Sequence, residues 1–318
     1  MGRPFFIGRA KAMDKLALLM GLVFSIMWSS AFATARILME GAPPFLTLTA
    51  RFAISGLIAV LLARALGQNW RFDRATLRSV IVFGVCQNGL YLGLNFLAMQ
   101  KIEASLAAII ASAMPLIVAL LAWAMRGERM GALGISGLIA GFVGVALVMG
   151  SRMSGGADGW MVLACVIGAA ALAVATLTVG SASRGGNLLM IVGLQMWVGA
   201  LVLGVVSALI EVPKIVPSPA LLAAFIYQIL VPGLSATLIW FALVGRIGAI
   251  KASAFHFLNP AFGVIIAAVL LGEHISLTDI IGVVVAALGI LAVQLSKLRR
   301  GAAPSVPPDV PANAPPIG

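Results

Sequence analysis

Charged residues are scarce in this sequence. Of its 318 residues only 10% are Asp, Glu, Lys or Arg, whereas 62% are hydrophobic and the mean hydropathy is +1.12. Soluble domains have about a quarter of their residues charged, so this composition excludes a soluble protein. The apolar runs are continuous rather than alternating, which disfavours a transmembrane barrel and favours helices. We therefore predict an all-α integral membrane protein.

Cysteine is almost absent as well. Cys86 and Cys165 are the only two, and both lie in apolar runs, where a thiol behaves as a small apolar group. This predicts no disulfide and no metal site. The chain also lacks a Gly-rich Lys-Ser/Thr phosphate-binding loop, so we expect no ATP coupling and no cofactor. Its net charge of +11 is spread over many loops, which argues against nucleic acid as a partner.

Ten stretches are long and apolar enough to cross a bilayer. A span needs about 20 apolar residues at a helical rise of about 1.5 Å per residue. We predict spans at residues 16–38, 45–66, 76–98, 103–124, 131–149, 159–180, 187–210, 220–243, 249–271 and 276–296. The lipid bilayer is therefore the first partner that we expect for this chain.

Basic residues concentrate on one side of these spans. With the N-terminus inside, most Lys and Arg residues fall in inner segments, and the outer loops hold only Lys101, Arg152 and Lys214. This bias is the positive-inside rule, and it predicts both termini in the cytoplasm. We expect a multi-pass protein of the cell (inner) membrane.

The second half of the sequence repeats the first without a gap. A proline in an apolar run, then Gly-Glu, then two spaced glycines occur twice, 145 residues apart (260 − 115 = 145): Pro115, Gly127, Glu128, Gly137, Gly144 and Pro260, Gly272, Glu273, Gly282, Gly289. Such a repeat indicates a duplicated unit. Because each copy has five spans, an odd number, the second copy is upside down. The predicted fold is ten transmembrane helices arranged as two inverted five-helix repeats.

These boundaries divide the chain into four segments. Residues 1–15 form a cytoplasmic N-terminal segment, 16–150 the first repeat and 151–296 the second, inverted repeat. Residues 297–318 form a cytoplasmic tail that we expect to be disordered, because it is rich in proline and has little else to pack.

Arg51 is a charged residue well inside a predicted span. A buried charge in hydrocarbon costs a few kcal/mol on insertion scales, so it calls for a partner or a function. Two interpretations are open: Arg51 is structural, extending outward to the membrane surface or pairing with Glu40 or Glu103, or it binds an anionic group of a substrate. No Asp or Glu lies in the middle of a span, which argues against a buried carboxylate relay for protons.

The third span carries a polar stripe. Asn88, Tyr91 and Asn95 follow one another at helical steps of three and four, and Gln87 adjoins them. Amides can hold membrane helices together, but a stripe near the bilayer centre also suits the wall of a cavity. We favour the cavity.

The ninth span carries His256 and Asn259 one turn apart, whereas the matching positions in the first repeat are Ala111 and Met114. His256 is the only imidazole within a span, and its intrinsic pKa makes it the one proton carrier that we predict there. Pro260 follows Asn259 and removes a backbone hydrogen bond near mid-membrane. Pro115 and Pro260 are thus candidate hinges of the fourth and ninth spans.

Two small-residue patterns have alternative interpretations. Gly134-Ile135-Ser136-Gly137 fits the Gly-x-Ser-Gly pattern of intramembrane serine proteases, with His256 as its base, although glycine and serine commonly serve helix packing. The glycines of spans 5 and 10 predict close helix contacts, either within the bundle or between two protomers of a homodimer.

Taken together, these features resemble the EamA-type members of the drug/metabolite transporter superfamily. The features are Trp28-Ser29-Ser30-Ala31-Phe32, Arg51-Phe52 and the twin blocks "AMPLIVALLAWAMRGERM" and "FLNPAFGVIIAAVLLGEHI". The resemblance covers residues 16–296 and implies a central substrate cavity formed by both halves. It places the following residues within reach of that cavity: Trp28, Gln87, Asn88, Tyr91, Ser112, His256 and Asn259.

The resemblance and the polar residues together favour a transporter over an enzyme. The leading hypothesis is a secondary transporter that exports small metabolites, amino acids above all, by alternating access. Arg51, available for a carboxylate, and the third-span stripe support it, because a bulky lipophilic cation prefers aromatic and acidic walls. Multidrug efflux is the first alternative, and an intramembrane serine protease built on Ser136 and His256 is the alternative from another class.

Overall fold

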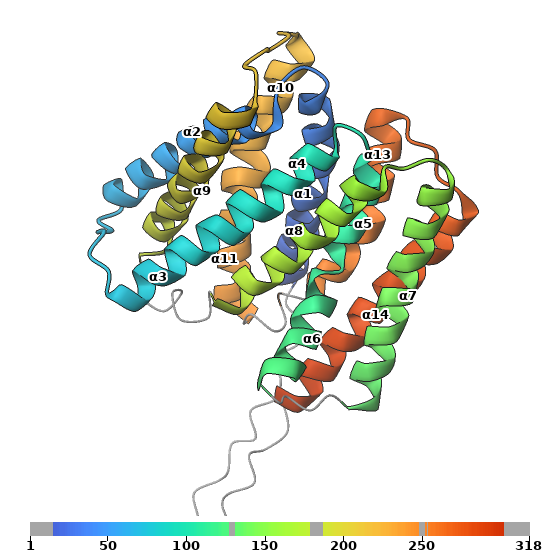
Figure 1. The fold of residues 1–318 in the computed structure, drawn as a ribbon. Helices are drawn as coiled ribbons and strands as arrows, with labels where there is room; N and C mark the ends of the chain where they lie inside the picture. Colours follow the sequence, from blue (N-terminus) through green and yellow to red (C-terminus); the bar gives the residue numbers. More distant parts are fainter. Residues whose placement is uncertain (1–14, 127–130, 179–186, 248–251, 253, 302–318) are drawn as a thin grey trace, which may run out of the picture.

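The computed structural model describes residues 15–126, 131–178, 187–247, 252 and 254–301 (Figure 1). Within these residues every regular element is a helix. The predicted N-terminal segment up to residue 14, the tail from residue 302 and the Gly127-Glu128 motif lie outside the described residues.

The first half contains five helical spans, two of them interrupted. They are α1 (Lys15–Met39), α2 (Pro44–Ala65), a third span of α3 (Arg74–Phe83), η1 (Gly84–Leu92) and α4 (Gly93–Ala98), a fourth of α5 (Ala104–Ser112) and α6 (Met114–Arg126), and α7 (Ala132–Ser154). Helix starts follow local chemistry: prolines open α2, and the Asp73 side chain caps α3 by accepting from the Thr76 amide at 2.9 Å.

The second half has the same order of elements. They are α8 (Gly159–Thr178), α9 (Leu188–Ile210), an eighth span of α10 (Pro219–Gln228), η3 (Ile229–Ser235) and α11 (Ala236–Ile247), a ninth of η4 (Ala254–Leu258) and α13 (Asn259–Leu271), and α14 (Leu277–Gly301). Within the described residues nine spans are long and apolar enough to cross a membrane, and the tenth is the shorter apolar helix Phe255–Leu271. The structure therefore confirms ten helices in the described residues, nine of which are long enough to be candidate spans.

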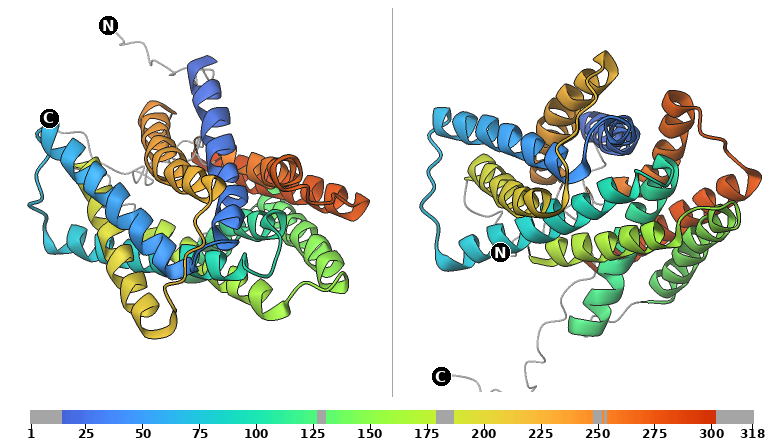
Figure 2. Two further views of the ribbon diagram at one scale, coloured as in Figure 1. Left: turned by 90° about the horizontal axis from the view of Figure 1, so that it is seen from above. Right: turned by 45° about the horizontal axis from the view of Figure 1, so that its top comes forward.

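Equivalent helices of the two halves pack against each other. α2 lies beside α9 on one side of the bundle and α7 beside α14 on the opposite side, with α5 and α13 between these two pairs (Figures 1 and 2). Between α7 and α14, Gly137 contacts Gly289 and Gly144 contacts Gly282. Residue numbers therefore rise along α7 in the direction in which they fall along α14. Equivalent helices that run antiparallel are what an inverted repeat requires, and the predicted fold class is confirmed.

The glycine faces of spans 5 and 10 pack within the chain. A Cβ added to Gly137 would lie 2.9 Å from the carbonyl oxygen of Gly289, and one added to Gly282 would lie 2.8 Å from that of Gly144. These two contacts are related by the 145-residue interval. Because backbone meets backbone here, only glycine fits, and these faces are not available for contact with a second protomer.

The repeats also cap each other's helices. The Glu211 carboxylate, just after α9, accepts from the amides of Phe45 and Leu46 at the start of α2, at 2.9 and 2.8 Å. At the other end of the same pair, Gln68 Oε1, just after α2, accepts from the Met190 amide at 3.1 Å. Phe45 and Met190 are 145 residues apart, so the two capped helix starts are equivalent, and each cap satisfies a free amide at a helix start.

The second Gly-Glu motif has the same capping function. Gly272 ends α13 with φ +68°, a left-handed conformation that favours glycine. Glu273 then turns back, and its carboxylate accepts from the amides of Ala104 and Ser105 at the start of α5, at 2.7 and 3.0 Å. The motif that revealed the repeat therefore joins the two repeats physically.

Candidate functional site

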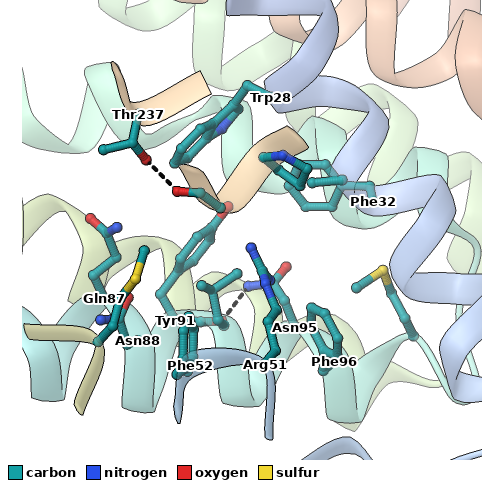
Figure 3. A pocket seen from close by; sticks show the side chains of 16 residues that line it. Trp28, Phe32, Arg51, Phe52, Gln87, Asn88, Tyr91, Asn95, Phe96 and Thr237 are labelled. Atoms are coloured by element: carbon teal, nitrogen blue, oxygen red, sulfur yellow. Dashed lines mark hydrogen bonds between the residues drawn. The ribbon is translucent and has the colours of Figure 1, made fainter. Parts of the chain in front are cut away.

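A cavity of about 60 Å³ lies between α1, α2, the third span and the eighth span (Figure 3). Its walls are mostly apolar, with Phe52, Phe96 and Met196 among them. The polar side chains that line it are Arg51, Gln87, Asn88, Tyr91, Asn95 and Thr237. Five of these come from the first repeat. A largely apolar pocket with a few convergent polar groups is the usual form of a small-molecule site.

Two π-helical segments form opposite walls of this cavity. η1 begins at Gly84 and η3 at Ile229, which are 145 residues apart. The helix therefore widens to a π-helix at the equivalent position of the third and eighth spans. Pro232 within η3 contributes to the irregular turn because it has no amide hydrogen. π-helical turns are rare and often occur at functional sites. No feature of the local sequence of the third span predicted the first of these segments.

The cavity lies on the pseudo-twofold axis that relates the repeats. Four pairs of its lining residues are separated by 145 positions: Arg51 and Met196, Gln87 and Pro232, Asn88 and Gly233, Leu92 and Thr237. In three of the four pairs the residue from the first repeat is the more polar. Sequence analysis missed Met196, Pro232, Gly233 and Thr237, although applying the repeat interval to Arg51 and the third span would have found them.

Arg51 reaches this cavity from α2 and is only 5% exposed. Its Nε and one terminal nitrogen have no hydrogen-bond partner, and its guanidinium carbon lies 5.3 Å from the centre of the Phe52 ring. Glu103 pairs with Arg152 instead, and Glu40 is exposed. In the described residues the predicted pairing of Arg51 with either glutamate is therefore absent.

The third-span stripe lines the cavity and also bonds to protein. Asn88 Nδ2 donates to the Gln195 carbonyl of α9 at 2.9 Å, which is the helix-joining role. Asn95 Nδ2 donates to the Tyr91 carbonyl at 2.8 Å, and its Oδ1 is buried without a partner. Tyr91 is 2% exposed, and Gln87 is half-buried. The stripe thus combines both interpretations: Asn88 joins helices, and Asn95 leaves an acceptor free.

A second, smaller cavity of about 20 Å³ lies where the fourth and ninth spans meet. It is lined by Trp28, Phe32, Ala111, Ser112, Met114, Pro115, Leu172, His256 and Asn259. The Nδ1 atom of His256 and the Asn259 amide nitrogen are 3.0 Å apart. Trp28 and Phe32 line both cavities, so α1 forms the partition between them.

The candidate hinges lie where these two spans are interrupted. α5 ends at Ser112 and α6 begins at Met114, while the 3₁₀ segment η4 gives way to α13 at Asn259. Pro115 and Pro260 are the second residues of the helices that follow. Helix breaks near the midplane are common at the substrate sites of transporters.

Ser136 lies apart from both cavities. It is exposed on α7, and its hydroxyl donates to the Leu133 carbonyl at 3.3 Å. His256 bonds to Asn259 and packs against the rings of Phe24 and Trp240. The hydrogen bond between nucleophile and base that a serine protease needs is absent from this described pair.

Ion pairs join the repeats at the end of the bundle where α2, α5 and α14 begin, here called the acidic end. Arg152, at the end of α7, pairs with Glu103 before α5 and with Asp279 of α14, the latter at 2.8 Å. Arg152 also donates to the His274 carbonyl at 3.0 Å. These bonds hold the ends of spans 4, 5 and 10 together.

A second ion pair lies close by on the surface. Lys101 Nζ is 3.3 Å from Asp158 Oδ2, and this hydrogen bond is the main reason that the pKa of Asp158 lies below its ordinary value. Lys101 belongs to the first repeat and Asp158 opens the second. Bonds between the two repeats therefore bridge the acidic end.

Two inverted repeats of five helices, with cavities on the axis between them, define a membrane transporter of the duplicated type. The EamA-like transporter family matches this chain twice, at residues 15–150 and 159–295, and the chain belongs to that family. Its substrate is accordingly a small molecule, and the protein is a transporter and not an enzyme.

Known relatives agree with this assignment. The chain is 25% identical over 281 residues to "Uncharacterized transporter YvbV" of Bacillus subtilis (strain 168), covering 87% of this chain and 92% of the relative. It is 25% identical over 288 residues to "WAT1-related protein At3g02690, chloroplastic" of Arabidopsis thaliana, covering 86% and 67%. One solved crystal structure with 20% identity superimposes with a TM-score of 0.66 over 91% of this chain and 100% of that one, which shows a shared fold.

Proposed function

We propose that this protein is a secondary transporter that exports small metabolites, in particular amino acids, by alternating access. The observation that carries the proposal is the axial cavity, which both repeats build from equivalent positions. Inverted repeats of this kind expose a central site to one side and then the other by rocking against each other. The substrate site consists of Trp28, Arg51, Gln87, Asn88, Tyr91, Ser112, His256 and Asn259, with Pro115 and Pro260 as hinges.

The lining favours amino acids over multidrug efflux. Among the described residues that line the two cavities, one side chain carries a full positive charge and none is a carboxylate. A lipophilic cation is stabilised best where a carboxylate accompanies aromatic rings; these cavities have aromatic rings but no carboxylate, and the one full charge, on Arg51, repels a cation. A zwitterion finds a guanidinium, amides and a hydroxyl here.

A flux screen tests this proposal. The purified protein is reconstituted in liposomes, and uptake is measured for amino acids, sugars, nucleosides and cationic dyes. We expect saturable flux of amino acids above that of empty liposomes, and none of dyes. Selective flux of dyes would replace the proposal with multidrug efflux.

The proposed orientation places the acidic end outside and both termini in the cytoplasm. Lys214 and Asn69 are exposed and lie 145 residues apart, in loops at opposite ends of the bundle. In intact cells we expect an impermeant thiol reagent to label Lys214→Cys and to spare Asn69→Cys until the cells are lysed. The reverse labelling pattern would invert the assignment.

Transport is proposed to be facilitative, since neither cavity offers a carboxylate for proton relay. Aromatic rings and the Asn259 amide surround His256, the only imidazole of the spans. We expect a proton gradient to leave the steady-state level of substrate in liposomes unchanged, and His256→Gln to retain downhill exchange. Gradient-driven accumulation that is lost in His256→Gln would instead make His256 the coupling residue.

A further inference from the structure

Among the described residues no carboxylate pairs with the guanidinium of Arg51. It is buried, two of its nitrogens have no hydrogen-bond partner, and no carboxylate lines its cavity in the described structure. An unpaired buried charge is one of the most destabilising features that a fold can carry. A ligand with an anionic group would remove this penalty, whereas a neutral or cationic ligand would not.

The acceptor left free on Asn95 adds to this requirement. Asn95 Oδ1 is buried without a donor, and Asn95 and Arg51 reach the same cavity of about 60 Å³ from neighbouring helices (Figure 3). A molecule that satisfies both groups carries an anionic acceptor for Arg51 and a donor for Asn95. The carboxylate and ammonium groups of an α-amino acid are such a pair.

The opposite wall differs because the repeats have diverged. Arg51 is matched across the axis by Met196, and Asn88 by Gly233. The second repeat therefore presents a thioether and backbone where the first presents a cation and an amide. Such a site distinguishes the two ends of a bound molecule.

We infer that the substrate carries a carboxylate, which binds Arg51 on the side of the first repeat while a small apolar side chain rests against Met196 and Pro232 of the second. This rests on the proposed function and specifies its substrate class. A planar guanidinium binds a carboxylate through two parallel hydrogen bonds, and a primary amine or an amide cannot replace that group. The small volume favours small side chains over large ones, so L-alanine and L-valine serve as probes.

The first test changes the ligand and leaves the protein intact. Thermal unfolding of the purified wild-type protein is followed with L-alanine, L-valine, or the same molecules without the carboxylate, ethylamine and isobutylamine. We expect the amino acids to raise the unfolding temperature and to exchange across liposomes in a protein-dependent way, relative to protein-free liposomes, and the amines to do neither. Equal stabilisation or exchange by an amino acid and its amine would overturn the inference, while amino-acid transport and the proposed function would stand.

The second test changes the protein. In Arg51→Met we expect binding of L-valine to weaken at least about 30-fold, as for loss of a buried charge partner. We also expect the ligand-free variant to unfold at a higher temperature than wild type, because the unpaired charge is gone. Arg51→Lys should fall between the two, since it keeps the charge and loses the paired geometry.

The matched control is Arg64→Met, on the exposed inner end of the same helix, where Arg64 lies over the Trp70 ring. It should bind L-valine as wild type does. Unchanged valine binding in folded Arg51→Met would contradict the assigned role of Arg51. If no compound of the flux screen moves through the wild-type protein, the proposed function fails as well, so the two failures are distinguishable.

Discussion

Linking residue 101 to residue 158 is expected to stop transport completely. Lys101 and Asp158 lie on different repeats and meet at 3.3 Å at the acidic end. If the repeats rock against each other, these positions must separate to admit or release substrate. In Lys101→Cys/Asp158→Cys, a short cross-linker with two thiol-reactive groups and a reducible bond should abolish flux in liposomes. Reductant should restore the flux.

Single-cysteine variants treated with the same linker serve as controls and should keep their flux. They also account for reaction at Cys86, which is half-buried, and at Cys165, which is buried. Full transport by protein shown to be cross-linked would mean that the acidic end does not open, and alternating access would be wrong.

Arg152→Met is expected to cause a large loss of stability. The Arg152 side chain is 15% exposed and pairs with an Asp279 side chain that is 1% exposed. Removing one partner of a buried pair leaves the other charge uncompensated, at a cost of about 3–5 kcal/mol. We expect a fall of roughly 10 °C in the unfolding temperature, taking about 2–4 °C per kcal/mol.

The neighbouring surface pair provides the control for this prediction. Lys101 and Asp158 have side chains that are 60% and 29% exposed, and such pairs contribute about 0–1 kcal/mol. Lys101→Met should therefore unfold within a few degrees of wild type. Equal effects of the two substitutions would show that Arg152 is no more important for stability than a solvated pair.

The fold could be predicted because its main signals are local. Long apolar runs specify spans, and a repeat without gaps carries its register over the whole chain. The interval of 145 residues, found from Pro115 and Glu128, also relates the caps at Phe45 and Met190 and the starts of η1 and η3. One pattern thus reported both topology and pairwise contacts.

The site was less predictable because it depends on contacts between distant residues. From the sequence, Glu40 and Glu103 were both candidate ion-pair partners for Arg51. Only the fold shows that Glu103 forms its ion pair with Arg152 instead. Asn88 was predicted as a cavity residue, yet its side-chain amide also donates a hydrogen bond to the Gln195 carbonyl. Three predicted residues, Ser112, His256 and Asn259, line the smaller cavity rather than the one that contains Arg51.

Counterflow in liposomes tests the central claim, alternating access of one axial site, most directly. Liposomes containing the purified protein are loaded with unlabelled L-valine and diluted into a trace of labelled L-valine. Alternating access predicts a transient accumulation of label above equilibrium, because internal valine occupies the site on its return. Entry that is linear with concentration and unaffected by internal valine would contradict the account and indicate a channel.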